Sequence, residues 1–495
     1  MPLIPLKIPP GVYRVGTDFE GSNRWRDANL IRWHQGSMRP IGGWTAKTDI
    51  SASLTTTPRA MHAWVDNTQG ANIALGTSEE IVYVNASGTA YDITPVGFTT
   101  GADDAAINTA FGGTYYGTGL YGVKRPSTGA FQETDVWTLD NWGEYLVGVA
   151  TQDGKLYEWQ LNTGTPAAQI ANSPVSCKSL LVTEERFIFA LQAGGSPRKV
   201  AWCDREDNTL WTPAATNEAG DIELQTSGEI MCGARMRGRS IILTNVDAHI
   251  ATYQGPPYVY GFERVGTACG AVSRKSLVAI DQGAFWMGSE SFYVFDGSTA
   301  KQMPCDVQDY VFEGMNKNQM TKVFAVHNSE YGEIWWFYPS QGSTECDTYV
   351  SYDYLENHWE IGSLERTTGA DQGVFDEPLW VDPTGVIYEH ELHGVGHGGL
   401  TPYAETGPIS LGNGDTVMKV NQLIPDEGTQ GEVNVTFKTR FHPNDTERTY
   451  GPYDTANPTS LRFTGRQMRM RVESTGNNDW RVGVMRVNAE PGGRR

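Results

Sequence analysis

Three histidines near residue 390 are the side chains whose spacing comes nearest to a metal site. The segment HELHGVGH contains His390, His393 and His397. A zincin needs two histidines four residues apart on a helix, but the fourth residue after His390 is Gly394, and Gly394 with Gly396 disfavours a helix. A loop could still bring the three imidazoles to one metal. A polar loop at the edge of the last strand group is the simpler interpretation, so we predict no metal site.

Carboxylates are the second candidate for chemistry, because glycosidases use a pair of Asp or Glu side chains. Asp204, Glu206 and Asp207 lie together in CDREDNTLW, where a turn with a solvated face is the favoured interpretation. Residues 151–159 differ from a sialidase Asp box, since their Asp directly precedes Gly. No nucleophile elbow, phosphate loop or dinucleotide-binding pattern occurs in a strand-turn-helix context. We therefore predict no catalytic residue, no cofactor and no enzymatic activity.

The cysteines and the hydropathy pattern bear on where the chain is made. The cysteines are widely spaced without a C-x-x-C pair, which predicts buried free thiols in a chain made in a reducing cytosol. The start, MPLIPLKIPPG, is interrupted by prolines, so we expect no signal peptide. No run approaches the ~20 apolar residues of a membrane-spanning helix. The cysteines are Cys177, Cys203, Cys232, Cys269, Cys305 and Cys346.

The arginines are the strongest sign of a contact surface. In LRFTGRQMRMRVES, Arg469 and Arg471 alternate with Met468, Met470 and Val472, so a strand would present one apolar and one basic face. The basic face could be solvated, could contact phosphates of passing DNA, or could bind an acidic protein surface through bidentate Arg–carboxylate pairs. We favour the protein contact. The predicted ring or adaptor interface comprises Arg24, Arg26, Arg32, Arg462, Arg466, Arg469 and Arg471.

Charge is unevenly distributed along the chain. The net charge is -20, yet residues 1–60 hold eight Lys or Arg against four Asp or Glu, and residues 457–495 hold eight against three. The segment between these ends is therefore more acidic than the whole. An acidic body is poorly suited to wrapping nucleic acid, because phosphates need cations to replace their counterions. It could border DNA that must slide without sticking.

The elements that must position these residues are short strands. Strand candidates recur in groups of four that begin near residues 60, 136, 178, 230, 276, 323 and 373. Apart from one insert, the spacing is about 40 to 50 residues, which is typical of a β-propeller with four strands per blade. We predict about seven blades. Two packed β-sandwiches would also supply many short strands.

Two segments illustrate how the blades should be built. Residues 281–298, DQGAFWMGSESFYVFDGS, read as two strands folded back on each other in the middle of one blade, with Trp286 and Tyr293 between neighbouring blades. Residues 305–319 predict one amphipathic helix that caps or bridges two blades. Its apolar stripe would comprise Val307, Tyr310, Val311 and Met315.

The insert at 99–134 is rich in Gly, Thr and Tyr and has few charges or aliphatic residues. It could be a disordered surface loop. Alternatively it is an arm whose tyrosines anchor on a partner, since Tyr gives large contact area at low entropic cost. The predicted contact residues of this arm are Tyr115, Tyr116 and Tyr121.

The two chain ends should form a separate body. Segments such as TVMKVNQLI and GEVNVTFKTRF alternate well, which favours an antiparallel sheet or sandwich. We therefore predict an all-β chain in which a propeller (58–400) is inserted into a β-sandwich-like platform domain. The platform would combine residues 1–57 with residues 401–495.

These segments resemble the tail hub proteins of short-tailed bacteriophages, also called nozzle or packaged-DNA stabilisation proteins. The resemblance rests on GVYRVGTDFEGSNRWRDANLIRWHQGSMRPIGGW, on WCDREDNTLW, on HIATYQGPPYVYGFERVG and on the basic end GRQMRMRVES. It covers most of the chain, although its motifs are diffuse patterns of aromatic residues and glycines.

The resemblance implies a structural virion protein, made in the host cytoplasm and located in the tail. Six copies would form a ring-shaped tube below the portal and the adaptor. This tube would retain packaged DNA and conduct it during ejection. The implied partners are the tail adaptor, fibre or spike proteins, and double-stranded DNA in non-specific passage. The alternative is a tail propeller that binds or cleaves host surface glycans.

Overall fold

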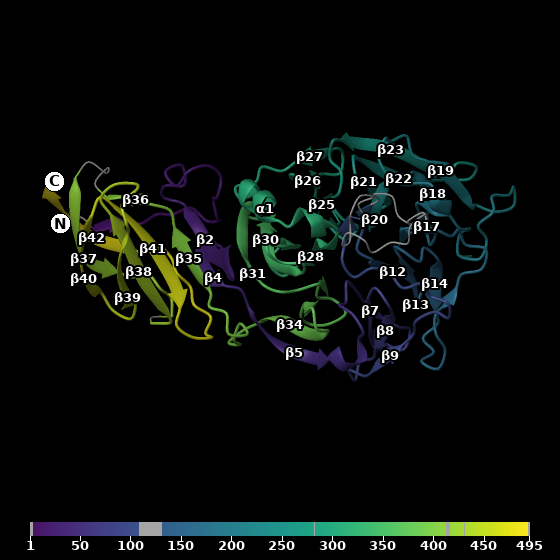
Figure 1. Ribbon diagram of the computed structural model, residues 1–495, viewed down its shortest axis with the longest axis horizontal. Coiled ribbons are helices and arrows are strands. Elements are labelled where there is room, and N and C mark those ends of the chain that lie inside the picture. Colours follow the sequence, from purple (N-terminus) through teal and green to yellow (C-terminus); the bar gives the residue numbers. More distant parts are fainter. Residues whose placement is uncertain (1–2, 108–130, 282, 412–415, 430, 494–495) are drawn as a thin grey trace, which may run out of the picture.

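The computed structural model describes residues 3–107, 131–281, 283–411, 416–429 and 431–493. The molecule is elongated, with a platform at one end and a propeller at the other (Figure 1). Both chain ends lie in the platform. The regular elements of the described residues are almost entirely strands, as their alternating and aromatic-rich segments predict.

The first four blades of the propeller are antiparallel meanders of four strands. Their first strands are the innermost, and each lies beside the first strand of the next blade. In chain order the strands are β6 (Ala60–Val65), β7 (Ala71–Gly76), β8 (Ile81–Val84) and β9 (Ala90–Asp92); β12 (Trp137–Trp142), β13 (Tyr145–Ala150), β14 (Leu156–Trp159) and β15 (Ala168–Gln169); β16 (Ser179–Val182), β17 (Ile188–Leu191), β18 (Lys199–Trp202) and β19 (Gly220–Glu223); and β20 (Ile230–Met236), β21 (Arg239–Thr244), β22 (Asp247–Gly255) and β23 (Val259–Thr267).

Three further blades complete the ring, and the innermost strand of blade seven lies beside β6. The described residues therefore form a closed toroid of seven blades, which confirms the predicted propeller. Blades five to seven contain β24 (Leu277–Ile280), β25 (Gly283–Met287), β26 (Phe292–Phe295) and β27 (Ala300–Gln302); β28 (Phe324–Asn328), β29 (Glu333–Pro339), β30 (Cys346–Asp353) and β31 (His358–Ser363); and β32 (Thr368–Ala370), β33 (Leu379–Val381), β34 (Val386–Leu392) and β5 (Gly43–Asp49).

The ring closes with a strand from the N-terminal part of the chain. Strand β5 pairs antiparallel with β34, with Thr48 opposite Ile387 and Ala46 opposite Tyr388. The prediction that residues 1–57 belong wholly to the platform is therefore wrong, because β5 is the fourth strand of blade seven. Local pattern could not reveal this pairing, since the first and last blades become neighbours only when the ring closes.

The predicted hairpin at 281–298 is the middle of blade five, with Trp286 opposite Tyr293. Trp286 is fully buried and packs with Met231 and Ile241 of blade four. The predicted position of this aromatic pair between blades is confirmed. All six cysteines are free and buried, as predicted.

The platform consists of two antiparallel sheets, each of which contains strands from both ends of the chain. Their inner faces share one apolar core, in which the rings of Phe437 and Phe463 lie 5.2 Å apart. The predicted sandwich built from both termini is confirmed. One sheet has the order β1 (Leu3–Pro5), β42 (Arg486–Gly493), β37 (Val417–Ile424), β40 (Thr459–Gly465), and the other β2 (Trp25–Asn29), β35 (Tyr403–Thr406), β41 (Gln467–Ser474), β38 (Val433–Arg440), β39 (Arg448–Asp454), with β36 (Ile409–Ser410) also on β41.

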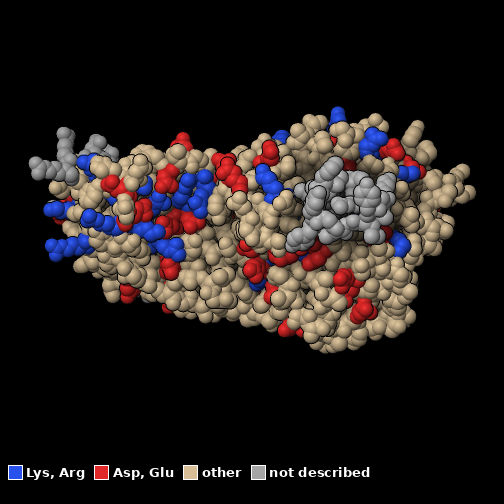
Figure 2. Space-filling model, viewed as in Figure 1, with Lys and Arg blue, Asp and Glu red and all other residues tan. Residues whose placement is uncertain are grey.

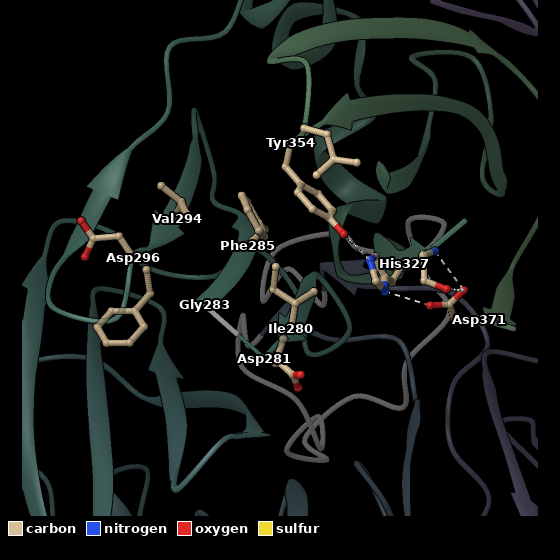
Figure 3. A pocket seen from close by; sticks show the side chains of 13 residues that line it. Ile280, Asp281, Gly283, Phe285, Val294, Asp296, His327, Tyr354 and Asp371 are labelled. Atoms are coloured by element: carbon tan, nitrogen blue, oxygen red, sulfur yellow. Dashed lines mark hydrogen bonds and ion pairs between the residues drawn. The ribbon is translucent and has the colours of Figure 1, made fainter. Parts of the chain in front are cut away.

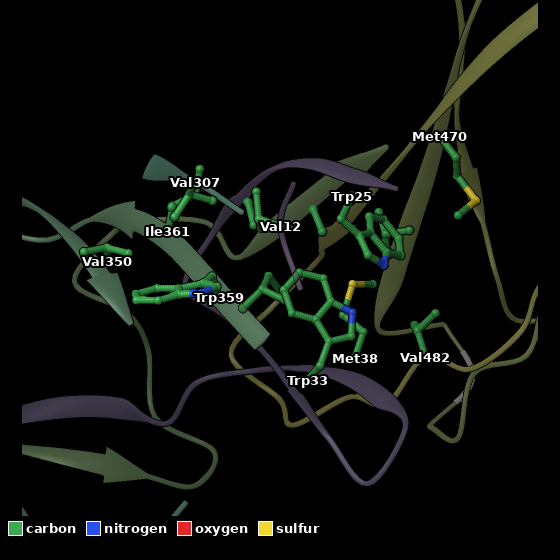
Figure 4. Packing of buried hydrophobic residues seen from close by; sticks show 14 of the residues in the cluster. Val12, Trp25, Trp33, Met38, Val307, Val350, Trp359, Ile361, Met470 and Val482 are labelled. Atoms are coloured by element: carbon green, nitrogen blue, oxygen red, sulfur yellow. The ribbon is translucent and has the colours of Figure 1, made fainter. Parts of the chain in front are cut away.

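The platform and propeller are joined by a continuous apolar core rather than by a bare linker (Figure 4). Trp25 and Trp33 of the N-terminal segment lie 5.8 Å apart and pack toward Trp359 of blade six. The backbone N–H of Val12 donates to the carbonyl of Trp359 at 2.7 Å. Strands β3 (Ile31–His34) and β4 (Ser37–Pro40) form a hairpin in this joint region.

The predicted helix at 305–319 is shorter than expected. It is split into α1 (Gln308–Gly314) and the 3₁₀ turn η3 (Lys317–Lys322), because Met315 adopts an extended conformation with ψ of 140°. The predicted apolar stripe is nevertheless buried, since Val307, Val311 and Met315 lie in the apolar core that joins the platform to the propeller, here called the joint core. The remaining short elements are η1 (Ser51–Ser53), η2 (Ala193–Gly195), β10 (Ala106–Ile107) and β11 (Phe131–Gln132).

Candidate interaction surfaces and channel plug

Strand β41 has the predicted two faces, but its arginines are paired within the chain. Met468, Met470 and Val472 are buried, while the alternating Arg469 and Arg471 lie on the outer face. The guanidinium of Arg469 pairs with Asp18 and, at 2.8 Å, with Glu447. Arg471 donates to Glu473 at 2.7 Å and lies 3.5 Å above the ring of Tyr403. These charges are largely neutralised before any partner arrives.

Two of the predicted interface arginines near the N-terminus instead stabilise the region where the platform joins the propeller. Arg24 pairs with Asp306 at 3.1 Å, beside α1. Arg26 donates to the carbonyls of Tyr13 and Gly16 at 3.2 and 3.0 Å, which holds residues 13–16 against β2. Both side chains therefore position the N-terminal segment within the chain.

Arg32 is not a surface residue, so its assignment to the ring or adaptor interface is wrong. Its side chain is 1% exposed and lies between Glu333 of β29 and Glu391 of β34. Nη1 donates to Glu391 at 2.7 Å, and Nη2 donates to Glu333 at 2.7 Å. Burial opposes the charge of Arg32, but the two carboxylates outweigh it and raise its pKa. The sequence could not show that both acids converge on this residue.

Cations without internal partners occur instead on the outer face of the β1-β42-β37-β40 sheet, here called the distal face. Lys419 of β37, Arg462 of β40 and Arg486 of β42 are exposed, and none of them forms an ion pair with a described residue. They share one face because their strand neighbours Val420, Phe463 and Val487 are buried on the other. Figure 2 shows Lys and Arg gathered at this end of the platform.

Of the arginines predicted to form the interface, only Arg462 is exposed on the distal face as the structure describes it. Arg466 lies between β40 and β41, is half-buried, and has its backbone tied to Arg440. Lys419 and Arg486 were missed, although the alternation in VMKVNQLI and RVNAE would have placed both on a polar strand face.

A second feature is a plug over one mouth of the propeller channel. The channel plug comprises the described ends of the insert, residues 101–107 and 131–135, in which β10 pairs with β11. It lies over the face of the propeller at which the innermost strands of the blades start. There its carboxylates meet four cations, namely Arg59, Lys178, Arg274 and Lys322, which lie at or just before β6, β16, β24 and β28.

The plug is held by ion pairs to blades on different sides of the axis. Asp103 binds Arg59 of blade one at 2.9 Å, and Asp104 binds Lys322 before blade six at 2.5 Å. Glu133 binds Arg274 before blade five at 3.0 Å. Glu133 also lies 3.6 Å from Lys178 before blade three, so the partners of the two plug segments are spread around the axis and the plug lies across the mouth.

Three of the four cations under the plug are almost completely buried. The side chains of Lys322, Arg274 and Arg59 are 0, 3 and 4% exposed. A buried cation is stable only when a carboxylate or other acceptor compensates it. The plug carboxylates are therefore integral to the propeller. The predicted arm residues Tyr115, Tyr116 and Tyr121 lie outside the described residues.

One plug carboxylate is not compensated. Asp135 is fully buried and accepts a hydrogen bond from the backbone N–H of Gln152 at 2.8 Å, but its Oδ2 atom has no hydrogen-bond partner among the described residues. Burial raises the pKa of Asp135 to about 7. This residue therefore titrates near neutral pH at the edge of the channel.

The histidines of HELHGVGH do not converge. His390 is buried between aromatic rings and accepts from Nε of Arg366 at 3.0 Å, whereas His397 Nε2 lies 2.9 Å from the carbonyl of Ile41. His393 is 67% exposed and pairs with Asp479. Across the residues that the structure describes, no group of three metal-ligating side chains is present. Nor is any helix there long and apolar enough to span a membrane.

The carboxylate cluster in CDREDNTLW is a turn, as expected. Asp204 accepts from the backbone N–H groups of Arg205 and Glu218, and Asp207 accepts from Thr209. These bonds occupy the carboxylates locally and fix the loop after β18.

No family model matches the chain, and no curated protein sequence matches it. Solved structures with a similar course include virginiamycin B lyase from Staphylococcus aureus, at 7% identity and a TM-score of 0.40, with 68% of this chain and 96% of the lyase covered. PorZ, a surface component of the type-IX secretion system of Porphyromonas gingivalis, has 8% identity and a TM-score of 0.37, with 77% and 44% covered. At such values we draw nothing about activity from either protein.

Proposed function

We propose that this chain is a structural subunit of the tail of a short-tailed bacteriophage. Six copies would join through their platforms into a nozzle or hub tube below the portal and adaptor. The observation that supports this most directly is the distal face, where Lys419, Arg462 and Arg486 are exposed and form no ion pair with the part of the chain that the structure describes. The face also contains Glu490, opposite Lys419 in register, so it keeps an excess of positive charge. Such a face favours contact with an acidic surface of the adaptor or of a neighbouring subunit.

The architecture suits a rigid conduit wall. A closed ring of blades has only short protected edges and resists bending, and the joint core ties that ring firmly to the platform. Because the channel plug crosses the axis of each propeller, the proposed path for DNA is the lumen between subunits. Retained DNA would be held there until ejection begins.

The charge of the chain supports passage rather than capture of DNA. Each copy carries a net charge of -20, so six copies would surround the lumen with negative potential. Like charge keeps the duplex away from the wall and lowers sliding friction, whereas a basic wall would bind phosphates and release counterions.

The test measures assembly of the full chain by light scattering with negative-stain imaging. We expect ring-shaped particles of roughly 330 kDa from six copies of the 54.5 kDa chain. Joint replacement of Lys419, Arg462 and Arg486 by Glu should abolish the rings and leave a folded monomer, because it reverses the distal face.

The matched control is charge reversal at two exposed arginines of blade four, Arg237→Glu with Arg264→Glu, which should leave assembly unchanged. Monomers at every concentration, with or without an adaptor protein, would contradict the proposed ring. Rings that survive the distal-face variant would show that another surface joins the subunits.

A further inference from the structure

A cavity of about 860 Å³ lies between blades five, six and seven, where their innermost strands end. This is the opposite mouth of the channel from the plug, which contacts the starts of those strands. Pockets of this size commonly hold a small molecule or one or two side chains of a bound peptide. The cavity is lined mainly by Ile280, Phe285, Val294, His327, Tyr354 and the acids Asp281, Asp296 and Asp371.

One wall of the cavity is a fixed hydrogen-bond chain (Figure 3). Nδ1 of His327 lies 2.8 Å from Asp371, and Nε2 lies 3.1 Å from the hydroxyl of Tyr354. Asp371 accepts the proton on Nδ1, so in the neutral imidazole Nε2 accepts the tyrosine proton. With its proton engaged, the Tyr354 oxygen presents lone pairs to a ligand.

The other polar groups of the cavity are also acceptors or are already occupied. The hydroxyl of Ser329 donates to Asp371 at 3.1 Å, and Asp296 is bound by Lys301. In Figure 3 the Asp296 carboxylate points away from Phe285. Asp281 is exposed and forms no hydrogen bond or ion pair with a described residue. The cavity therefore offers a carboxylate and a phenol oxygen, with no free side-chain donor among these groups.

The apolar wall defines the rest of the ligand. Phe285 and Tyr354 stack with their ring centroids 5.8 Å apart, and Ile280 and Val294 extend this surface. An aliphatic stem can pack there while its charged end remains near the rim, as lysine and arginine stems commonly do. The ring of Tyr354 also stacks on His327, with the ring centroids 5.9 Å apart, which fixes this wall of the cavity.

We propose that this cavity binds a guanidinium or ammonium group on an aliphatic stem, that is, an arginine or lysine side chain of a partner protein segment. The argument is one of complementarity, because the described side-chain groups of the rim that remain open are acceptors and include the Asp281 carboxylate, which matches a donor-only cation. A saccharide would need donors as well as acceptors. The site is independent of ring assembly through the distal face.

The experiment titrates the full-length protein with N-acetylarginine amide by calorimetry. The neutral N-acetylcitrulline amide, which has nearly the same shape, and an uncharged disaccharide serve as comparison probes. We expect binding of the arginine probe alone. Asp281→Asn should weaken it by about ten-fold, and Tyr354→Phe, which keeps the ring and removes the oxygen, by about two- to five-fold.

A matched control separates the site from the overall negative charge of the protein. Asp376→Asn removes the same charge from an exposed position outside the cavity and should leave affinity unchanged. Thermal unfolding of each variant confirms that it is folded. Equal binding of the citrulline probe, preferred binding of the disaccharide, or equal losses in the Asp281 and Asp376 variants would each overturn the proposal.

Discussion

At the scale of single residues, the charged side chains of this protein fall into two groups: those paired with an opposite charge within the chain and those without such a partner among the described residues. Arg32 is enclosed by two carboxylates where the platform joins the propeller, while Arg462 on the distal face meets none among the described residues. The first arrangement fixes β3 against two blades, because an unpaired charge in that place would be strongly destabilising. The second leaves a charge available to a partner. Residue type alone does not distinguish these roles.

Asp135 gives a pH-dependent prediction at this scale. Its pKa is raised from 3.8 to about 7 in the folded chain, so the folded state binds this proton more tightly than the unfolded state. Stability from this group is therefore full below about pH 4, falls as pH rises toward 7, and then stays low. Relative to Asp135→Asn, the wild-type free energy of unfolding should fall on the order of 4 kcal/mol across that window.

Chemical denaturation of both proteins at a series of pH values measures the difference. Comparing slopes removes any constant offset caused by the new amide, and other titrating groups cancel between the two proteins. Parallel pH profiles would show that Asp135 keeps an ordinary pKa in the folded chain.

At the scale of elements, the channel plug is the least expected feature. Its two strands contain only two residues each, and ion pairs to blades one, five and six attach it. Removing the plug charges should therefore loosen the plug and destabilise the cations beneath it. The ring itself should persist, because its closure depends on β5 and on packing between blades.

The double variant Asp103→Asn with Glu133→Gln tests this element. We expect faster hydrogen exchange in residues 101–107 and 131–135, by about ten-fold or more, with little change in the platform. Glu263→Gln on exposed β23 is the matched control and should not alter exchange in the plug. Unchanged exchange in the double variant would mean that backbone contacts suffice to hold the plug.

At the scale of the whole molecule, platform and propeller share one core, so they should unfold together. Trp359 is central to this coupling, since it is 3% exposed, packs 4.7 Å from Phe292, and donates from Nε1 to the carbonyl of Pro304 at 2.9 Å. A continuous buried interface gives a cooperative transition, whereas weakly joined domains unfold separately.

Trp359→Ala should lower the free energy of unfolding by about 3–5 kcal/mol, through lost burial and the cavity left behind. It should also separate one thermal transition into two, as measured by calorimetry. Leu355→Ala provides the control, because Leu355 is 68% exposed and its removal should cost little. Two transitions already present in the wild-type protein would contradict the single-core interpretation.

The sequence by itself determined the repeated architecture. Strand groups beginning near residues 60, 136, 178, 230, 276 and 323 coincide closely with the innermost strands, because each meander forms between adjacent segments whose apolar and turn residues are local. The alternation around Arg469 likewise predicted which face of β41 is buried.

Only the tertiary structure decided which distant residues meet. The pairing of β5 with β34, the enclosure of Arg32 and the ion pairs of the channel plug all join segments separated by more than about 40 residues, which no local periodicity encodes. The cavity at the far mouth likewise draws its lining from three blades. Such sites depend on ring closure, because only a closed ring brings the ends of non-consecutive strands to a common axis.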